Sequence, residues 1–307
     1  MNRLRALAPA KINLGLFLGP VRQLDGRHEL ISVMQSISLA DELTLEPAPS
    51  DASEDEVLCP GVTGPARENL AAGALRAFRA STGWDAPPLR LSIVKRIPVA
   101  AGLGGGSADA AAALRLARHA SGLGDERLLL ELGGELGADV PAQIAPGRWL
   151  ASGAGDLLQA LPDPRVPFGV LVLPSTEALS TAAVYGEADR LQLARTAQEL
   201  RARHVELSAA LAHGESLPGA RELLHNDLQR AAVSLCPPIA DALRGARTTG
   251  ADVVLLSGSG PTVLGLFDRA ERAEQAARAL AGAIPAPSSA TPVGAAFGEV
   301  IDLDRPG

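Results

Sequence analysis

Alternation between apolar and polar side chains is the main pattern in the first hundred positions. It predicts strands over four stretches: 4–18, 30–38, 42–47 and 89–96. Pro9 is expected to break the first strand, and Asp25 and Gly26 to form a turn before the second. The acidic stretch 50–56 predicts a solvent-exposed hairpin loop. This part of the chain is therefore predicted to be rich in strands.

Helical spacing of apolar residues is the second pattern. It predicts helices at 67–81, from near Ser107 onward, and at 125–136, 187–213, 238–247 and 269–283. Further strands are predicted at 168–173, at 252–267 as two strands around a glycine turn, and at 293–302. Because helices and strands do not alternate strictly, an α+β fold is favoured over a doubly wound parallel sheet. A change of character near residue 155 and a length of 307 residues predict two domains, 1–155 and 156–307.

The net charge and the cysteine content limit the kinds of molecule that the protein is expected to bind. A formal net charge of −7 argues against a protein that binds nucleic acid or an anionic membrane, because phosphate backbones demand basic surfaces. A small molecule bearing phosphate stays possible. Cys59 and Cys236 lie far apart in the sequence, which argues against a disulfide framework and a zinc site. Polar residues interrupt the apolar N-terminal run, so no membrane partner and a cytoplasmic location are expected.

Lysine is nearly absent from the chain. Of 28 basic residues only Lys11 and Lys95 are lysines, which leaves 26 arginines. A lysine ammonium is compact, and the broad guanidinium fork of arginine does not fit the same space. Chance survival is the alternative explanation for both. Tyr185 is the only tyrosine.

A glycine cluster between a predicted strand and a predicted helix is the strongest chemical signal. It comprises Pro98, Val99, Ala100, Ala101, Gly102, Leu103, Gly104, Gly105, Gly106, Ser107, Ala108 and Asp109. Glycines let the backbone approach an anion, and a helix start adds free N–H donors, so the segment predicts a phosphate-binding loop. The sequence fits neither a P-loop nor the dinucleotide motif G-x-G-x-x-G, and the protein-kinase signatures are absent. A merely flexible loop is the alternative.

Three shorter segments carry weaker signals. Residues 256–262 contain two serines and two glycines, which suit either a tight hairpin or close packing against a phosphate or another glycine loop. Lys11 and Asn13 share one face of a predicted strand, although a lysine facing solvent is the simpler interpretation. Asp139 follows a glycine bend, where an aspartate is more often a turn or cap residue than a catalytic one.

These segments, in this order, resemble the GHMP kinase superfamily. More narrowly, the chain is similar to the 4-diphosphocytidyl-2-C-methyl-D-erythritol kinases of the non-mevalonate isoprenoid pathway. The motifs that carry this resemblance are PAKINL at 9–14, DG-x-H at 25–28, P-x-x-x-GLGGGSAD at 98–109, GADVP at 137–141, HNDL at 225–228 and SGSGPT at 257–262. They extend over essentially the whole chain. The resemblance implies an S5-like N-terminal domain and a ferredoxin-like C-terminal domain.

The resemblance also implies roles for individual residues. ATP phosphates would lie along the loop 98–108, with Ser107 near Mg²⁺ and with Asn69 and Leu70 at the adenine. Asp139 would be the catalytic base, and Lys11 would hold the acceptor hydroxyl and the developing charge. The implied contacts of the cytidine-diphosphate substrate are Asn13, Arg27, His28 and Tyr185.

One of these contacts departs from the family pattern. Where the family has a tyrosine that stacks on cytosine, this chain has Arg27, whose guanidinium can stack on a base as well. Lys95 is a further candidate near the nucleotide, with its neighbour Arg96 as the alternative contact.

The function implied is ATP-dependent phosphorylation of the 2-hydroxyl of 4-diphosphocytidyl-2-C-methyl-D-erythritol. Two alternatives stay open. One is a GHMP kinase for another small molecule, such as mevalonate or homoserine. The other is a nucleotide-binding sensor that has lost turnover on the same fold. We expect a monomer or a homodimer.

Overall fold

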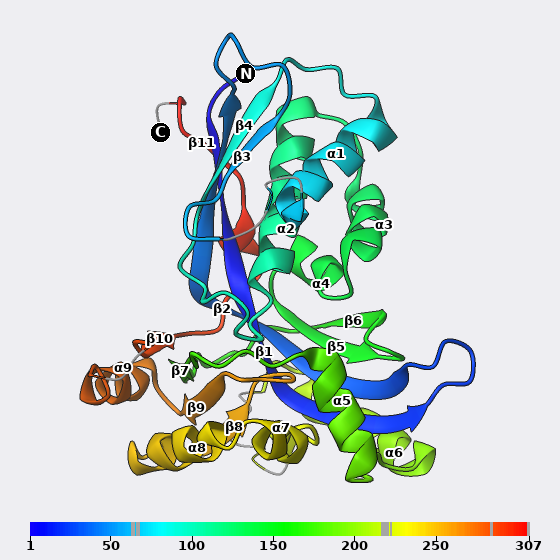
Figure 1. Ribbon diagram of the computed structural model, residues 1–307, viewed down its shortest axis with the longest axis vertical. Coiled ribbons are helices and arrows are strands. Elements are labelled where there is room, and N and C mark those ends of the chain that lie inside the picture. The colour runs from blue at the N-terminus through cyan, green and yellow to red at the C-terminus, as the bar shows by residue number, and fades with distance from the viewer. Residues whose placement is uncertain (63–64, 66–67, 216–220, 222, 283–284, 306–307) are drawn as a thin grey trace.

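The computed structural model describes residues 1–62, 65, 68–215, 221, 223–282 and 285–305, and it contains two sheets (Figure 1). The larger sheet has the order β11-β1-β2-β4-β3, and β2 also pairs with β5, which pairs with β6. Its strands are β1 (Leu4–Val21), β2 (His28–Pro47), β3 (Glu56–Leu58), β4 (Leu89–Val94), β5 (Arg148–Ser152), β6 (Leu157–Leu161) and β11 (Ile301–Asp302). The first two strands are the longest, and Figure 1 shows them running from one end of the molecule to the other.

Three expectations for the first strands of this sheet were wrong. Pro9 does not break β1, because a register shift between Pro9 and Ala10 absorbs the missing N–H donor. The runs 30–38 and 42–47 form one strand, since β1 pairs with β2 across the junction. The acidic stretch before Glu56 is not a hairpin loop, because it leads into β3, which pairs in parallel with β4.

Helices cover one face of this sheet. They are α1 (Leu70–Thr82), α2 (Gly105–Ser121), α3 (Glu126–Leu136) and α4 (Val140–Ile144). The alanine-rich α2 lies innermost, and its small side chains pack without exposure against the sheet and α1. This close packing fixes the N-terminus of α2, and with it the glycine cluster, against the sheet. The first residue of the predicted helix 67–81 lies outside the described residues.

The second sheet has four antiparallel strands in the order β10-β7-β9-β8. They are β7 (Gly169–Leu173), β8 (Val253–Leu256), β9 (Val263–Phe267) and β10 (Ser288–Ala290). The helices of this part are α5 (Thr181–Arg190), α6 (Ala197–Leu211), α7 (Gln229–Leu235), α8 (Pro238–Thr248) and α9 (Ala270–Ala279). Figure 1 shows α7, α8 and α9 beside this sheet and α5 and α6 near the far end of the β1–β2 hairpin.

Two predictions for this part were wrong. The stretch 187–213 is not one helix: α5 ends at Arg190, and α6 begins after Thr196, whose side chain forms a capping box with Glu199. The predicted strand 293–302 is instead a short 3₁₀ turn, Ala295–Gly298, followed by β11. The last residue of the predicted helix 269–283 lies outside the described residues.

The mixture of antiparallel sheets and packed helices confirms the α+β class. The predicted division after residue 155 falls in the turn between β5 and β6, and it stays a prediction. Among the residues described, no helix is both long and apolar enough to cross a membrane.

Candidate active site

Two cavities meet at the glycine cluster. One, of about 790 Å³, is lined by Lys11, Asn13, Arg27, His28, Asp139 and Tyr185 among others. The other, of about 360 Å³, is lined by Asn69, Leu70 and each residue from Pro98 to Ser107. We call them the acceptor cavity and the nucleotide cavity. Gly102, Gly104 and Ser107 line both. Of the predicted site residues, Ala108 lines neither cavity, because it is fully buried in the core, and Arg96, the alternative to Lys95, lines neither as well.

The loop between the cavities has the backbone shape that glycine permits. Gly102 and Gly104 have φ values of +73° and +69°. A Cβ on Gly102 would lie 2.5 Å from the carbonyl oxygen of Gly260, and one on Gly104 would lie 2.9 Å from Cγ of Lys11. Helix α2 starts at Gly105, two residues before the predicted start, and no side chain caps it. Its first N–H groups are therefore placed to bind an anion.

Lys11 and Asp139, which are far apart in the sequence, form an ion pair in the acceptor cavity. The distance from Nζ of Lys11 to Oδ2 of Asp139 is 3.2 Å, and Nζ also donates to Oδ1 of Asn13 at 3.0 Å. The backbone N–H of Lys11 donates to the Leu103 carbonyl, which ties β1 to the glycine loop. Asp139 sits in the bend between α3 and α4, with its side chain 39% exposed. An ammonium and an accessible carboxylate thus lie next to the loop.

The serine–glycine turn between β8 and β9 supports this loop. The Thr262 hydroxyl donates to the Ala101 carbonyl at 2.6 Å, and the Ser257 hydroxyl lies 3.5 Å from the Gly102 carbonyl. The other end of the Asn13 side chain is also fixed, because its amide nitrogen donates to Oγ of Ser32 on β2 at 2.7 Å. Both interpretations of residues 256–262 hold: the Ser257 N–H donates to the Thr262 carbonyl in a tight turn between β8 and β9, and the turn packs against the neighbouring glycine loop.

The far end of the acceptor cavity combines aromatic and cationic groups. The rings of His28 and Tyr185 lie 5.6 Å apart, centre to centre. Nδ1 of His28 is 2.8 Å from the Gly19 carbonyl, and the Arg27 guanidinium donates to the Ala154 carbonyl at 2.7 Å. Burial raises the pKa of the Tyr185 hydroxyl, and the charge of Asp139 adds to the effect. The ring of Tyr185 therefore stays neutral and offers an apolar face.

The second lysine occupies a different setting, beneath the phosphate loop. Nζ of Lys95 contacts both the buried Asp41 and Oδ2 of Asp109, the latter at 2.7 Å. A Cβ on Gly105 would point toward this cluster, 3.4 Å from Nζ. Lys95 lines the nucleotide cavity, whereas the side chain of Arg96 is 55% exposed and pairs with Glu42.

Burial dominates the electrostatics of this cluster. Burial raises the pKa of Asp109 to about 7; Lys95 opposes the rise and Asp41 adds to it. Burial alone would lower the pKa of Lys95, but the two carboxylates outweigh it and the pKa is raised. Oδ1 of Asp109 has no hydrogen-bond partner in the described part of the chain.

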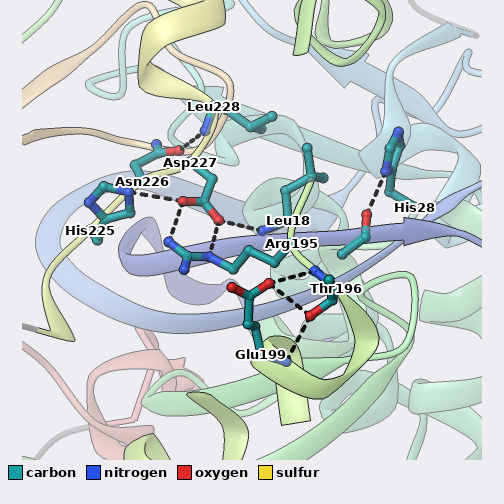
Figure 2. Close-up of polar contacts among 10 residues, drawn as sticks. Leu18, His28, Arg195, Thr196, Glu199, His225, Asn226, Asp227 and Leu228 are labelled. Carbon is teal, nitrogen blue, oxygen red and sulfur yellow. Dashed lines mark hydrogen bonds and ion pairs between the residues drawn. The ribbon is translucent and has the colours of Figure 1, made fainter. Parts of the chain in front are cut away.

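The HNDL motif at 225–228 has a structural role that the sequence did not indicate. Asp227 accepts a hydrogen bond from the Leu18 backbone N–H and pairs with both Arg195 and His225 (Figure 2). Burial opposes ionisation of Asp227, but hydrogen bonds from His225 and Arg195 outweigh it and lower its pKa. The Asn226 amide donates to the carbonyls of Leu256 and Gly258. The motif therefore fastens β1 to the serine–glycine turn, and both border the acceptor cavity.

Comparison with known proteins identifies the family. Residues 69–147 match the GHMP kinases N terminal domain, and residues 207–286 match the GHMP kinases C terminal model. The chain belongs to the GHMP kinases. A Streptomyces avermitilis protein named 4-diphosphocytidyl-2-C-methyl-D-erythritol kinase is 41% identical over 89% of this chain and 90% of its own length. A Streptomyces coelicolor protein of the same name is 39% identical over 95% and 97%.

Solved GHMP kinases agree in fold. A crystal structure of 4-(cytidine 5'-diphospho)-2C-methyl-D-erythritol kinase superposes with a TM-score of 0.76 at 33% identity, covering 94% of this chain and 99% of its own. Homoserine kinase from Cytophaga hutchinsonii superposes with a TM-score of 0.73 at 17% identity, covering 98% of both chains, which shows the fold alone. The resemblance found in the sequence motifs is therefore confirmed, including its narrower branch.

As a GHMP kinase, the chain uses ATP. No cluster of three or more His, Cys, Asp or Glu side chains that could hold a metal ion occurs among the described residues. Mg²⁺ commonly binds through one or two protein oxygens together with substrate phosphates and water, so it needs no such cluster. The Ser107 hydroxyl, which lies where the cavities join, is compatible with that arrangement.

Proposed function

We propose that this chain transfers the γ-phosphoryl group of ATP to the 2-hydroxyl of 4-diphosphocytidyl-2-C-methyl-D-erythritol, a step of isoprenoid biosynthesis. The observation that carries the proposal is the Lys11–Asp139 ion pair beside a glycine loop that borders both cavities. ATP would occupy the nucleotide cavity, with its phosphates on the loop, and the cytidylyl substrate the acceptor cavity. The chain would act as a monomer or a homodimer.

In the proposed reaction, the Asp139 carboxylate accepts the proton of the attacking hydroxyl. The hydroxyl oxygen forms a bond to the γ-phosphorus, the bond from that phosphorus to the bridging oxygen of ADP breaks, and ADP carries away the electron pair. Lys11 holds its ammonium 3.2 Å from Asp139, where it stabilises negative charge on the acceptor oxygen and the transferring group. When Mg²⁺ is bound, with Ser107 as its candidate protein contact, it neutralises phosphate charge.

The arrangement of the acceptor cavity explains the choice of substrate. Tyr185 and Arg27 offer faces for stacking, and His28 offers a ring nitrogen to the edge of a base. Mevalonate and homoserine have no base to occupy that end of the cavity. This observation favours a substrate with a nucleobase over the substrates of other GHMP kinases.

A coupled assay of ADP release tests the proposal. The cytidylyl substrate should support turnover, whereas mevalonate and homoserine should support none above the rate without acceptor. Turnover with mevalonate or homoserine instead would overturn the choice of substrate. Nucleotide binding without turnover on any acceptor would favour the sensor alternative.

A further inference from the structure

Asn226, in the HNDL motif, contacts the serine–glycine turn but lines neither cavity. The residue is 5% exposed. Its Nδ2 donates to the carbonyl of Leu256 at 2.8 Å and to that of Gly258 at 2.7 Å. Its Oδ1 accepts the backbone N–H of Leu228 at 2.9 Å (Figure 2). Both amide hydrogens and the amide oxygen are thus engaged, so Asn226 fixes the path of the backbone through residues 256–258.

The same motif is bound to strand β1. The Leu16 N–H donates to the His225 carbonyl at 2.7 Å, and the Asp227 N–H donates to the Leu16 carbonyl at 3.0 Å. These two bonds form a parallel bridge between Leu16 and Asn226. Strand β1 also carries Lys11, which lines the acceptor cavity. Residues 225–227 therefore hold β1 and the serine–glycine turn together.

The turn in turn presses against the phosphate loop. The Thr262 hydroxyl donates to the Ala101 carbonyl at 2.6 Å. A Cβ on Gly102 would lie only 2.5 Å from the carbonyl oxygen of Gly260, so the two backbones are in direct contact. Closely packed groups transmit a displacement instead of absorbing it. A shift of the turn would therefore move the loop relative to β1.

We propose that Asn226 is a positioning residue for phosphoryl transfer, which sets the placement of the phosphate loop relative to Lys11. This inference rests on the proposed function, since it takes the ATP phosphates to lie on the loop and the acceptor hydroxyl beside Lys11. Reacting atoms must be held about 3–3.5 Å apart, and a misplacement of ~1 Å by a distant change can cost about 10²-fold in rate. Asn226 therefore controls the rate through the turn without touching either substrate.

The test is Asn226→Asp, with Gln229→Glu as the matched control. Both variants exchange an amide for a carboxylate of the same shape. In Asn226→Asp an acceptor oxygen replaces Nδ2 and faces the two carbonyls, which should displace the turn. Gln229 contacts the turn through Oε1, which accepts the Leu256 N–H at 3.1 Å, and a glutamate keeps that acceptor.

The expected result is a separation of kcat from KM. In Asn226→Asp, kcat should fall by at least about tenfold. The KM for the cytidylyl substrate should stay nearly constant, because Asn226 does not line its cavity. In Gln229→Glu, both constants should equal those of the wild type. Thermal unfolding establishes that each variant is folded at the assay temperature.

A double-mutant cycle provides a second measurement, and it applies also where Asn226→Asp does not fold. Asn226→Ala and Thr262→Val remove the polar contacts on the two sides of the turn without adding charge. If Asn226 acts through the turn, the two losses are coupled, and the double variant should lose about as much kcat as the more damaging single variant. Losses in kcat that multiply would show independent effects and would overturn the inference.

Two further outcomes would contradict the positioning role. One is a lower melting temperature with unchanged kcat in Asn226→Asp, which would make Asn226 a residue of the fold alone. The other is an equal loss of kcat in Gln229→Glu. The choice of substrate is tested separately, because the measurements use whichever of the cytidylyl substrate, mevalonate and homoserine the wild type phosphorylates. Wild-type turnover on none of the three would overturn both proposals.

Discussion

The two lysines of this chain lie on either side of one phosphate loop, and their surroundings differ. Lys11 faces the acceptor cavity, where its ammonium meets one partly exposed carboxylate, Asp139, and the amide of Asn13. Lys95 lies beneath the loop and meets two buried carboxylates, Asp41 and Asp109. Both positions are confined, which accounts for an ammonium at each in a chain that otherwise uses arginine.

This difference in surroundings indicates different roles for the two lysines. The partner of Lys11 is accessible, so a substrate hydroxyl can approach both groups. The partners of Lys95 are buried, and Oδ1 of Asp41 also accepts the backbone N–H of Ile97 at 2.8 Å, at the entry to the loop. Lys95 therefore contributes to the shape of the phosphate site, and Lys11 is positioned for the transfer itself.

The largest effect is expected at the carboxylate of the Lys11 site. Asp139→Asn keeps the size and polarity of the side chain but removes the proton acceptor, so kcat should fall by at least about 10²-fold. ATP affinity should change little, since Asp139 lines only the acceptor cavity. Steady-state kinetics together with a nucleotide titration measure both values. A variant with near-normal kcat would remove Asp139 from the reaction.

Lys11→Arg should come next. It keeps the charge but adds bulk beside Gly104, whose Cα already approaches the stem of Lys11 so closely that a Cβ would lie 2.9 Å from Cγ. We expect kcat to fall between about tenfold and 10²-fold, or about 1.4–2.7 kcal/mol of transition-state stabilisation. Thermal unfolding of the variant provides the control for folding. Activity like that of the wild type would show that the position requires only charge.

Lys95→Arg makes the same exchange of lysine for arginine at the second lysine and is compared with Lys11→Arg. An arginine there must fit between Asp41, Asp109 and the underside of the loop, and overpacking of this kind typically costs about 1–3 kcal/mol of stability. The melting temperature should therefore fall more in Lys95→Arg than in Lys11→Arg, whereas kcat should fall less. If the two variants lose kcat and melting temperature in the same proportion, the contrast between the lysines is wrong.

Sequence periodicity predicted most of the fold but missed the β5–β6 hairpin, and Arg148 explains why. This arginine is 1% exposed, and it donates from Nε to Gln35 and from a terminal nitrogen to the Glu215 carbonyl. Burial lowers its pKa to about 10. Because this arginine occupies a buried position of β5, the strand does not show the usual alternation of apolar buried and polar exposed residues. Its hydrogen-bond partners, Gln35 and Glu215, are distant in the sequence. The pattern of local residues therefore carried no sign of it.

The site was predictable only in part for a similar reason. The glycine loop is a local pattern, and its role in placing an anion follows from its own residues. Lys11 and Asp139 were paired by family resemblance, because nothing in either segment indicates the other. Asp189, which lines the acceptor cavity with Oδ1 2.9 Å from Nε2 of His28, gave no signal, since an exposed aspartate on a polar helix is ordinary.

The smallest expected effect is on the pH dependence of stability, and it concerns Asp109. Its pKa is about 7 in the folded protein against an ordinary value of 3.8. Between about pH 4 and pH 7, the folded state keeps a proton that the unfolded state has lost, so the stability of the wild type falls as the pH rises through this window.

The variant Asp109→Asn has no carboxyl group at this position and therefore no such proton. The free energy of unfolding of the wild type relative to this variant should therefore be greatest near pH 4 and decline toward pH 7. Urea titrations of the wild type and of Asp109→Asn at several pH values measure this difference. Parallel curves for the wild type and Asp109→Asn would mean that Asp109 is ionised throughout, with Lys95 outweighing its burial.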